Sequence, residues 1–218
     1  MTGRDGDAPL TARDVDILET VRAHDGYFKI DRYRLRHRLH EGGWSGVMNR
    51  EIFERGHAVA VLLFDPVLDK LVFIEQFRIG ALAAFKSPWF DAETVSPWLV
   101  ECVAGIIDEG ETPQDVARRE CLEEAGCEIS ALTPIAHYLV SPGGTTESIF
   151  LYCARVDASS VGGVHGLDHE HEDIRVFTMT SAETLDALER GRFTNSMTLI
   201  AVQWFKINRQ RLVLDWTS

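Results

Sequence analysis

The stretch GIIDEGETPQDVARRECLEEAGC, residues 105–127, contains an unusual concentration of carboxylates. It places Glu120, Glu123 and Glu124 three and four residues apart, and residues at that spacing share one face of a helix. Like charges there cost roughly 0.2–0.5 kcal/mol per pair in an isolated helix. A bound cation relieves such repulsion, and Mg²⁺ takes carboxylate oxygens together with waters and substrate phosphates. The alternative interpretation is an acidic helix face that is simply solvated.

Local signals in the same stretch predict a loop, a helix and a second loop. Thr112 is a favourable N-cap, Pro113 suits the first helical position, and Asp115 stands where a capping box has an acid. Gly126 provides a left-handed stop at the C-terminal end. These four residues predict a helix that begins at residue 113 and ends just before residue 126.

The helical projection also separates apolar residues from acidic ones. Cys121, Leu122 and Ala125 are expected to lie opposite the carboxylates and to anchor the helix on the core. Arg119 precedes Glu123 by four residues, so an ion pair between them is expected to hold the glutamate rotamer.

The fixed positions of the stretch match those of the Nudix box: Gly105, Glu111, Arg119, Glu120, Glu123, Glu124 and Gly126. Cysteines stand at 121 and 127, where aliphatic residues are usual, and they pack as small apolar residues. The chain therefore resembles the Nudix hydrolases, which cleave a nucleoside diphosphate linked to another group. This resemblance implies an α+β fold, an α/β/α sandwich around a mixed sheet.

Composition limits the classes of function. The chain has 218 residues and a net charge of −12, which argues against nucleic-acid binding because that requires a basic surface. The N-terminal segment lacks the apolar core of a signal peptide, and no apolar run has the length of a membrane span. Four cysteines without zinc-type spacing are expected to be buried thiols in a reducing compartment, with disulfides as the alternative. We therefore expect a cytoplasmic protein without membrane or nucleic-acid partners.

Hydrophobic patterns divide the chain into residues 1–54 and 55–218. The first part is expected to hold a polar, disordered tail to about residue 13 and a small antiparallel sheet. Its strands are expected at 15–21, 28–39 and 44–54. In the middle strand arginines at 32, 34, 36 and 38 alternate with less polar residues, so they share one face. That face attracts phosphate or, in the preferred interpretation, meets solvent or a partner.

The second part is expected to hold strands in hairpins with helices segregated to the sides, an α+β arrangement. Strands are expected at 57–66, 70–76, 98–104, 133–140, 149–156 and 175–179. Helices are expected at 181–190 and at about 195–212, after the helix in the Nudix box. The loop 82–97 carries Phe85, Trp89 and Phe90, which either form an exposed lid or subunit contact or are buried within the fold.

Outside the box the resemblance narrows to the ADP-ribose pyrophosphatase branch and covers nearly the whole chain. The segments that carry it are MNREIFERGHAVAVLLFDP (48–66), IEQFRIG (74–80), WLVECVAG (98–105), SPGGTTE (141–147) and HGLDHEHEDIRV (165–176). Enzymes of this type are homodimers whose N-terminal sheet helps to build the partner's substrate pocket. The resemblance therefore implies a homodimer that hydrolyses ADP-ribose to AMP and ribose 5-phosphate.

The resemblance assigns the metal site to Glu120 and Glu124, with Glu123 in the same group and the backbone carbonyl of Ala104 completing the inner shell. Two or three Mg²⁺ ions are expected, with Mn²⁺ as a substitute. Gly105 is expected to let the backbone turn sharply enough to aim that carbonyl inward.

The resemblance also assigns substrate contacts. Arg50 and Arg78 would hold the diphosphate or neighbouring groups, Tyr27 or Phe28 would stack on adenine, and Glu147 would accept hydrogen bonds from the terminal ribose. Glu101 and Gly144 complete the expected substrate-binding set. The alternatives are ordinary salt bridges for the arginines and core packing for the aromatic residues.

The general base is expected in the loop DHEHED, residues 168–173. The flanking motifs place it on Glu170, with Glu172 as the second candidate. A metal site using His169 and His171, or a solvated loop, are the alternatives. For the whole chain, the alternatives to ADP-ribose hydrolysis are hydrolysis of other ADP-sugars or nucleotide diphosphate derivatives and a non-catalytic Nudix-fold binding protein.

Overall fold

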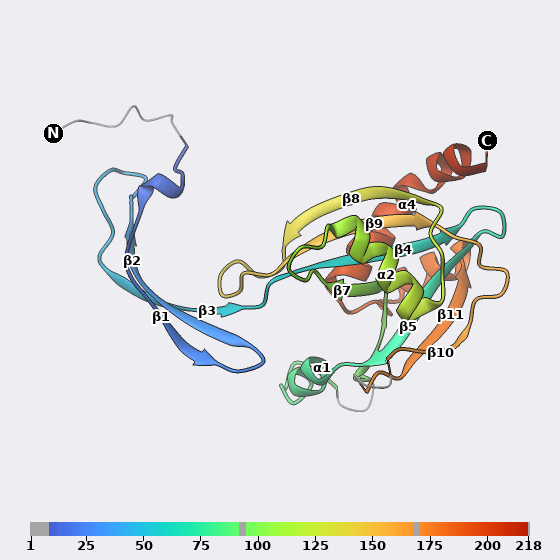
Figure 1. Cartoon of the computed structure of the whole chain (residues 1–218), viewed down its shortest axis with the longest axis horizontal. Helices are drawn as coiled ribbons and strands as arrows, with labels where there is room; N and C mark the ends of the chain where they lie inside the picture. Colours follow the sequence, from blue (N-terminus) through green and yellow to red (C-terminus); the bar gives the residue numbers. More distant parts are fainter. Residues whose placement is uncertain (1–8, 92–94, 168–170, 218) are drawn as a thin grey trace. The chain divides into compact units, whose positions relative to one another are not determined.

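The computed structural model describes residues 9–91, 95–167 and 171–217. The chain divides into two compact units (Figure 1). The first contains the residues up to Gly56 and the segment Leu139–Glu147, and the second contains His57–Tyr138 and the residues from Ser148 onward. Residues 1–8 of the expected disordered tail lie outside the described residues, and Ala12–Asp14 form a short 3-10 helix.

The first unit contains a three-stranded antiparallel sheet in the order β1-β2-β3. Its strands are β1 (Val15–Asp25), β2 (Lys29–His37) and β3 (Met48–Glu54). This confirms the small N-terminal sheet expected from the sequence.

The arginines of β2 and its continuation make specific contacts on this sheet. Arg36 donates two hydrogen bonds to Asp16, at 3.0 and 2.8 Å. The guanidinium groups of Arg36 and Arg38 lie 4.8 and 4.4 Å from the ring centroid of Trp44, a distance at which cation–π attraction operates. At least two of the four arginines are therefore occupied within the unit.

The second unit is built on a mixed sheet of eight strands. Its main path runs β10-β11-β5-β4-β9-β8, with β6 beside β5 and β7 beside β4. The pair β4–β9 is parallel, and the pairs β10–β11, β11–β5, β4–β5, β4–β7 and β5–β6 are antiparallel. The strands are β4 (His57–Asp65), β5 (Lys70–Phe77), β6 (Trp98–Glu101), β7 (Val103–Ile106), β8 (Ala131–Leu139), β9 (Ser148–Arg155), β10 (Gly163–His165) and β11 (Ile174–Thr180).

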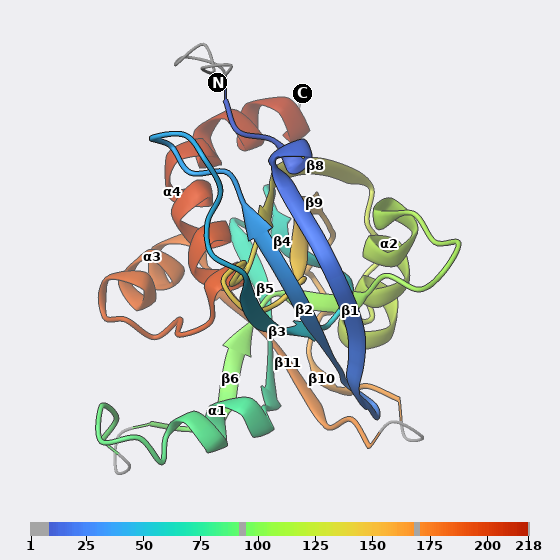
Figure 2. The same ribbon diagram turned by 90° about the vertical axis from the view of Figure 1, so that its left-hand side faces the viewer.

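Helices cover both faces of this sheet (Figure 2). On one face α2 (Pro113–Ala125) packs Val116, Ala117 and Cys121 into a buried apolar core. On the other face α3 (Ser181–Glu189) and α4 (Ser196–Thr217) close a second core, with Phe205 fully buried against Phe64. Because a sheet buries both faces only when each is covered, the unit is an α/β/α sandwich, as expected.

The termini of α2 follow the sequence signals. Thr112 and Asp115 form a reciprocal capping box, Pro113 is the first helical residue, and Gly126 caps the C-terminal end with a φ of 63°. The expected burial of Leu122 is wrong, since its side chain is 55% exposed. Glu124 is instead 4% exposed, so the buried side of the helix includes one of the carboxylates.

Three elements differ from the sequence-based expectation. The single strand expected at 98–104 is two strands, because the N–H of Cys102 donates to the side chain of Thr198 and not to a neighbouring strand. The short helix α1 (Ile79–Ala84) and the strand β10 were not expected. Both are too short for hydrophobic periodicity to reveal them.

Within the loop 82–97, Trp89 and Phe90 are exposed, whereas Phe85 is partly buried. Trp89 is 89% exposed, Phe90 is 43% exposed, and the rings of Phe85 and Phe90 lie 5.0 Å apart. The structure therefore supports exposure, and not burial within the fold, for Trp89 and Phe90. The expected role as lid or subunit contact stays a prediction.

All four cysteines are free and buried, which confirms the expected thiols.

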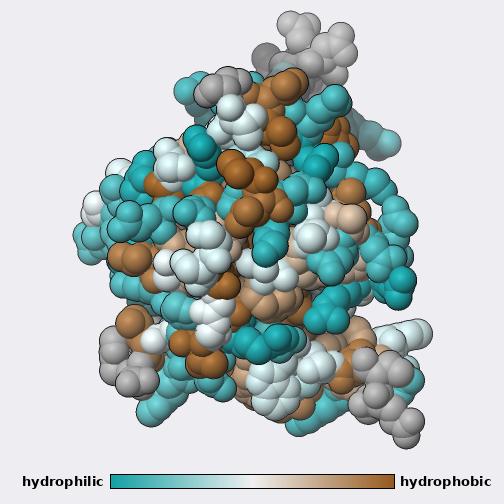
Figure 3. Space-filling model, turned by 90° about the vertical axis from the view of Figure 1, so that its right-hand side faces the viewer, coloured by the Kyte–Doolittle hydropathy of each residue, from teal (hydrophilic) through white to brown (hydrophobic). Residues whose placement is uncertain are grey.

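Within the described ranges, none of the helices combines the length and hydropathy that a membrane span requires. Hydrophobic and hydrophilic residues are interspersed over the face drawn in Figure 3.

Candidate active site

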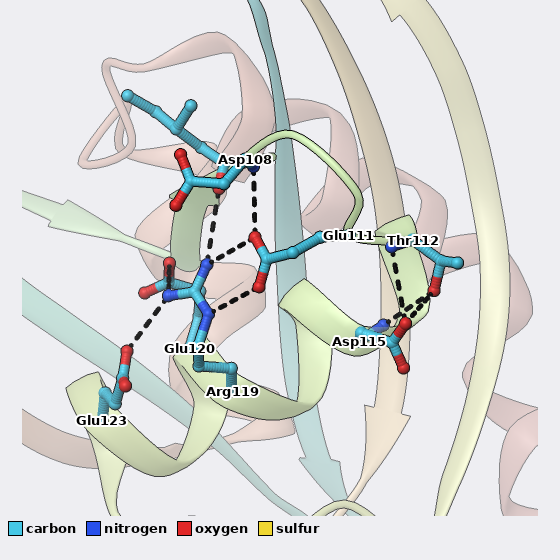
Figure 4. A network of polar contacts seen from close by, with 8 residues as sticks. Asp108, Glu111, Thr112, Asp115, Arg119, Glu120 and Glu123 are labelled. Atoms are coloured by element: carbon cyan, nitrogen blue, oxygen red, sulfur yellow. Dashed lines mark hydrogen bonds and ion pairs between the residues drawn. The ribbon is translucent and has the colours of Figure 1, made fainter.

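The guanidinium of Arg119 connects three glutamates of the Nudix box (Figure 4). Its Nη1 donates to Glu120 Oε1 at 2.7 Å and to Glu123 Oε2 at 3.1 Å. Its Nε and Nη2 donate to the two carboxylate oxygens of Glu111 at 3.0 and 3.1 Å. The expected pair with Glu123 is confirmed, and the same arginine also fixes two further carboxylates.

Glu111 attaches the loop before α2 to this network. Its carboxylate also accepts a hydrogen bond of 3.1 Å from the N–H of Asp108. The hydrogen bonds from Arg119, followed by that from Asp108, lower the pKa of Glu111. The loop is therefore anchored by an ionised carboxylate.

Gly105 is needed because the side chain of Glu120 occupies the space beside it. A Cβ atom at Gly105 would lie 1.7 Å from Glu120 Oε1 and 2.0 Å from its Cδ. Gly105 lies within β7, paired with Val59, and its φ is not positive. The sharp turn expected at this glycine is therefore wrong, and close approach of the carboxylate is the physical reason for glycine.

Glu120, Glu123 and Glu124 form the carboxylate cluster; the first two are partners of Arg119, and Glu124 is buried. Burial raises the pKa of Glu124 to about 8, opposed by a 2.9 Å hydrogen bond from the N–H of Ala104. Burial also raises the pKa of Glu120 to about 7, although Arg119 opposes this shift. Both carboxylates are consequently poised to ionise when a cation compensates the cost of burial.

Glu172 lies near the same carboxylates. Its negative charge contributes to the raised pKa of both Glu120 and Glu124. Its own carboxylate accepts a hydrogen bond of 3.1 Å from the N–H of Leu167. The other base candidate, Glu170, and His169 lie outside the described residues.

The chemistry of the carboxylate cluster fits a hard divalent cation. Among the described residues, Glu124 has no basic partner within ion-pair distance, and its carboxylate accepts its hydrogen bond from the backbone N–H of Ala104. Carboxylate oxygens that ionise when a cation binds suit Mg²⁺. In the part of the chain that the structure describes, however, no three such side chains have their donor atoms already placed around a common point. Arg119 engages oxygens of Glu120 and Glu123, so binding requires small side-chain shifts.

The second unit also contains Arg78 and Glu101. Arg78 follows β5 directly, and its Nε donates to Glu101 Oε2 at 2.7 Å. Its positive charge lowers the pKa of Glu124 against the effect of burial. Both residues therefore belong to the surroundings of the carboxylate cluster.

The first unit contains the remaining substrate candidates. Tyr27 is 87% exposed and Phe28 is 42% exposed, so neither is a core residue. Phe28 lies edge-on to Phe53, with 5.0 Å between ring centroids. Arg50 is exposed and its Nη1 donates to the backbone oxygen of Asn49.

Sequence reasoning did not single out Arg55, which links two candidates in this unit. Its guanidinium lies 5.1 Å from the ring centroid of Phe28, and its Nε lies 3.7 Å from Glu147 Oε1. The backbone oxygen of Gly144 accepts a hydrogen bond from the N–H of Phe53. An arginine just before Gly56 offers no distinguishing pattern, so only the folded arrangement reveals these contacts.

Comparison with known proteins identifies the family. The model of the NUDIX domain matches residues 54–197. The chain belongs to the NUDIX domain family. The matched region contains the whole box and the carboxylate cluster, so the family assignment and the geometry concern the same residues.

Individual relatives agree with this family. The ADP-ribose pyrophosphatase of Escherichia coli (strain K12) is 44% identical over 203 residues, 93% of each chain. The GDP-mannose pyrophosphatase of Cronobacter sakazakii is 32% identical over 162 residues, 72% of this chain and 78% of that protein. A crystal structure described as an ADP compounds hydrolase aligns with a TM-score of 0.66 at 20% identity, covering 97% of this chain and all of that chain. This last similarity concerns the fold.

The raised pKa values of Glu120 and Glu124 predict how stability depends on pH in the absence of metal. The folded values, about 7 and about 8, exceed the value of about 4.3 for a free glutamate. Between these limits the folded state binds more protons than the unfolded state, so the free energy of unfolding falls as pH rises. In EDTA, the melting temperature should fall between roughly pH 5.5 and pH 8.5.

The double variant Glu120→Gln/Glu124→Gln is the control, because it cannot titrate at these positions. Its melting temperature should change less over the same pH range. An identical pH dependence in both proteins would contradict the assigned shifts.

Proposed function

We propose that the protein is an ADP-ribose diphosphatase that hydrolyses ADP-ribose to AMP and ribose 5-phosphate. The observation that carries the proposal is an intact carboxylate cluster in a chain 44% identical, over 93% of its length, to an enzyme named ADP-ribose pyrophosphatase. In the reaction water attacks the phosphorus attached to adenosine, and the bond to the bridging oxygen breaks. That oxygen leaves with ribose 5-phosphate.

Glu120, Glu123 and Glu124, with the carbonyl oxygen of Ala104, would hold two or three Mg²⁺ ions, and Mn²⁺ would substitute. When bound, such ions neutralise phosphate charge and lower the pKa of bound water. Arg119 keeps two of these carboxylates oriented through its hydrogen bonds. The glutamates themselves supply the negative charge that makes the site selective for hard cations.

The candidates for substrate recognition have separate tasks. Arg78 and Arg50 would bind phosphate oxygens, since a guanidinium donates two parallel hydrogen bonds. Tyr27 or Phe28 would stack on adenine; Tyr27 has the more exposed ring, whereas the ring of Phe28 also contacts Phe53 and Arg55. Glu147 would accept hydrogen bonds from the terminal ribose, and Gly144 is a further candidate of the substrate-binding set. Glu101, also a candidate of that set, is only 2% exposed and contacts Arg78.

The proton of the attacking water would pass to a glutamate of the loop 168–173. Glu170 is the first candidate and Glu172 the second. The proximity of Glu172 to the carboxylate cluster, expressed in the raised pKa of Glu120 and Glu124, supports a role of this loop in the reaction.

A second candidate function is hydrolysis of another nucleotide sugar. The 32% identity to a GDP-mannose pyrophosphatase favours this alternative, because the Nudix box does not contact the variable group. The alternative retains the same hydrolytic chemistry and changes only the recognition of the base and the sugar.

We also propose that the chain is a cytoplasmic homodimer. In the first unit Ile17, Leu18 and Val21 of β1 are 42–56% exposed, and in the second unit Trp89 is 89% exposed. Exposed apolar residues in such numbers are typical of surfaces that another protein covers. Sedimentation should give twice the chain mass of 24.5 kDa, and a monomer with full activity would contradict the proposal.

Removing one charge from the carboxylate cluster should abolish most activity. Glu120→Gln and Glu124→Gln should each lower kcat for ADP-ribose by several orders of magnitude, because a charged ligand is lost at almost constant volume. Glu128→Gln, just beyond the box, is the matched control. Steady-state assays with Mg²⁺ should compare ADP-ribose, an ADP-sugar, GDP-mannose and a nucleoside triphosphate.

Two results would contradict the proposal. One is retention of more than about a tenth of the wild-type kcat in both variants, a loss of under ~1.4 kcal/mol of barrier stabilisation. The other is a higher kcat/KM for a different substrate of the panel than for ADP-ribose.

The two base candidates are separated by parallel variants. Glu170→Gln should lower kcat about 10²–10⁴-fold with little change in Mg²⁺ affinity, since a base acts in the proton transfer. The lost rate should recover at high pH, where hydroxide replaces the base. A larger loss in Glu172→Gln would move the assignment to Glu172, and unchanged rates in both would exclude the loop.

A further inference from the structure

Glu101 is a buried carboxylate with an unusual position. It is the last residue of β6 and only 2% exposed. Its neighbours Val100 and Cys102 are buried apolar residues of the sheet core. Burial raises the pKa of Glu101, and the guanidinium of Arg78 followed by the amide of Gln76 oppose that shift. Glu101 is thus too enclosed to be a freely accessible substrate contact.

The partner of Glu101 is fixed at its backbone but accessible at its outer end. The N–H of Arg78 donates to the oxygen of Pro97 at 2.8 Å, and its backbone oxygen accepts from Leu82 at 3.1 Å. The side chain of Arg78 is 39% exposed. Among the described residues, its Nη1 and Nη2 make no hydrogen bond or ion pair, whereas its Nε is held by Glu101 at 2.7 Å.

The guanidinium of Arg78 is therefore bound at Nε and, among the described residues, free at its two terminal nitrogens. With Nε engaged on the buried side, the two terminal nitrogens remain available to two oxygens of a phosphate group. Holding the long side chain in advance reduces the rotamer entropy lost on binding. The charge of the same guanidinium opposes the rise of the Glu124 pKa, so Arg78 lies within electrostatic range of the carboxylate cluster.

Stability alone gives a weak reason for this pair. Desolvating two charges offsets most of their attraction, and apolar replacements of buried pairs are often neutral or stabilising. We propose that Glu101 is a positioning residue, whose buried carboxylate holds Arg78 so that its terminal N–H groups meet the substrate diphosphate. This inference rests on the proposed hydrolysis of a nucleoside diphosphate derivative.

A double-mutant cycle on the full chain tests the inference. Glu101→Gln should raise KM for ADP-ribose about tenfold while kcat changes less, because a charged hydrogen bond to Arg78 is weakened. Arg78→Ala should raise KM at least as much. The double variant should have the same kcat/KM as Arg78→Ala alone, since Glu101 acts only through the missing arginine.

The melting temperatures of the variants should rank differently from their KM values. Arg78→Ala leaves the Glu101 charge buried without a partner, so this variant should melt below the double variant, in which that charge is absent. Glu75→Gln is the control. Glu75 lies on the adjacent strand β5 and forms an ion pair of 2.8 Å with Arg175. Breaking this pair should leave KM unchanged.

The outcomes are distinguishable. If the wild type is active and Glu101→Gln leaves KM unchanged, the positioning role alone is overturned. The same holds if the effects of the two substitutions on kcat/KM multiply in the double variant. A wild type that hydrolyses no ADP-ribose overturns the proposed function and this inference together.

Discussion

The ion-pair network of Arg119 is the interaction on which the candidate site depends. Carboxylates on one partly buried helix face repel each other, and a single guanidinium connects Glu111, Glu120 and Glu123 at 2.7–3.1 Å. The network joins the loop before α2 to the helix itself. It therefore keeps like charges together in the position where a divalent cation can bind, while Glu124 stays outside its reach.

Steric fit transmits this arrangement from the helix to the sheet. The space beside Gly105 in β7 is filled by the carboxylate of Glu120, and the N–H of Ala104 donates to Glu124. These contacts fix the distance between α2 and the strand next to it. Arg78, held by Glu101, adds positive charge from a neighbouring strand end. Residues of α2, of β7 and of the end of β5 thus all contact or influence the same carboxylates.

Sequence patterns predicted the parts of this structure that depend on local chemistry. Caps and turn residues place both ends of α2 correctly, and hydrophobic and turn patterns place most strands of both sheets. Long-range packing decided the rest. The exposure of Leu122, the burial of Glu124 and the division of one expected strand at Cys102 depend on neighbours distant in sequence. The same holds for Arg55, whose contacts with Phe28 and Glu147 have no local signature.

We propose that the carboxylate cluster is a divalent-cation site. The most direct test is anomalous diffraction from crystals of the protein soaked with Mn²⁺. We expect Mn²⁺ peaks bound by Glu120 and Glu124 with the carbonyl oxygen of Ala104, and their loss in Glu120→Gln/Glu124→Gln. Crystals in which Mn²⁺ binds elsewhere while the cluster keeps only its contacts with Arg119 would contradict the claim.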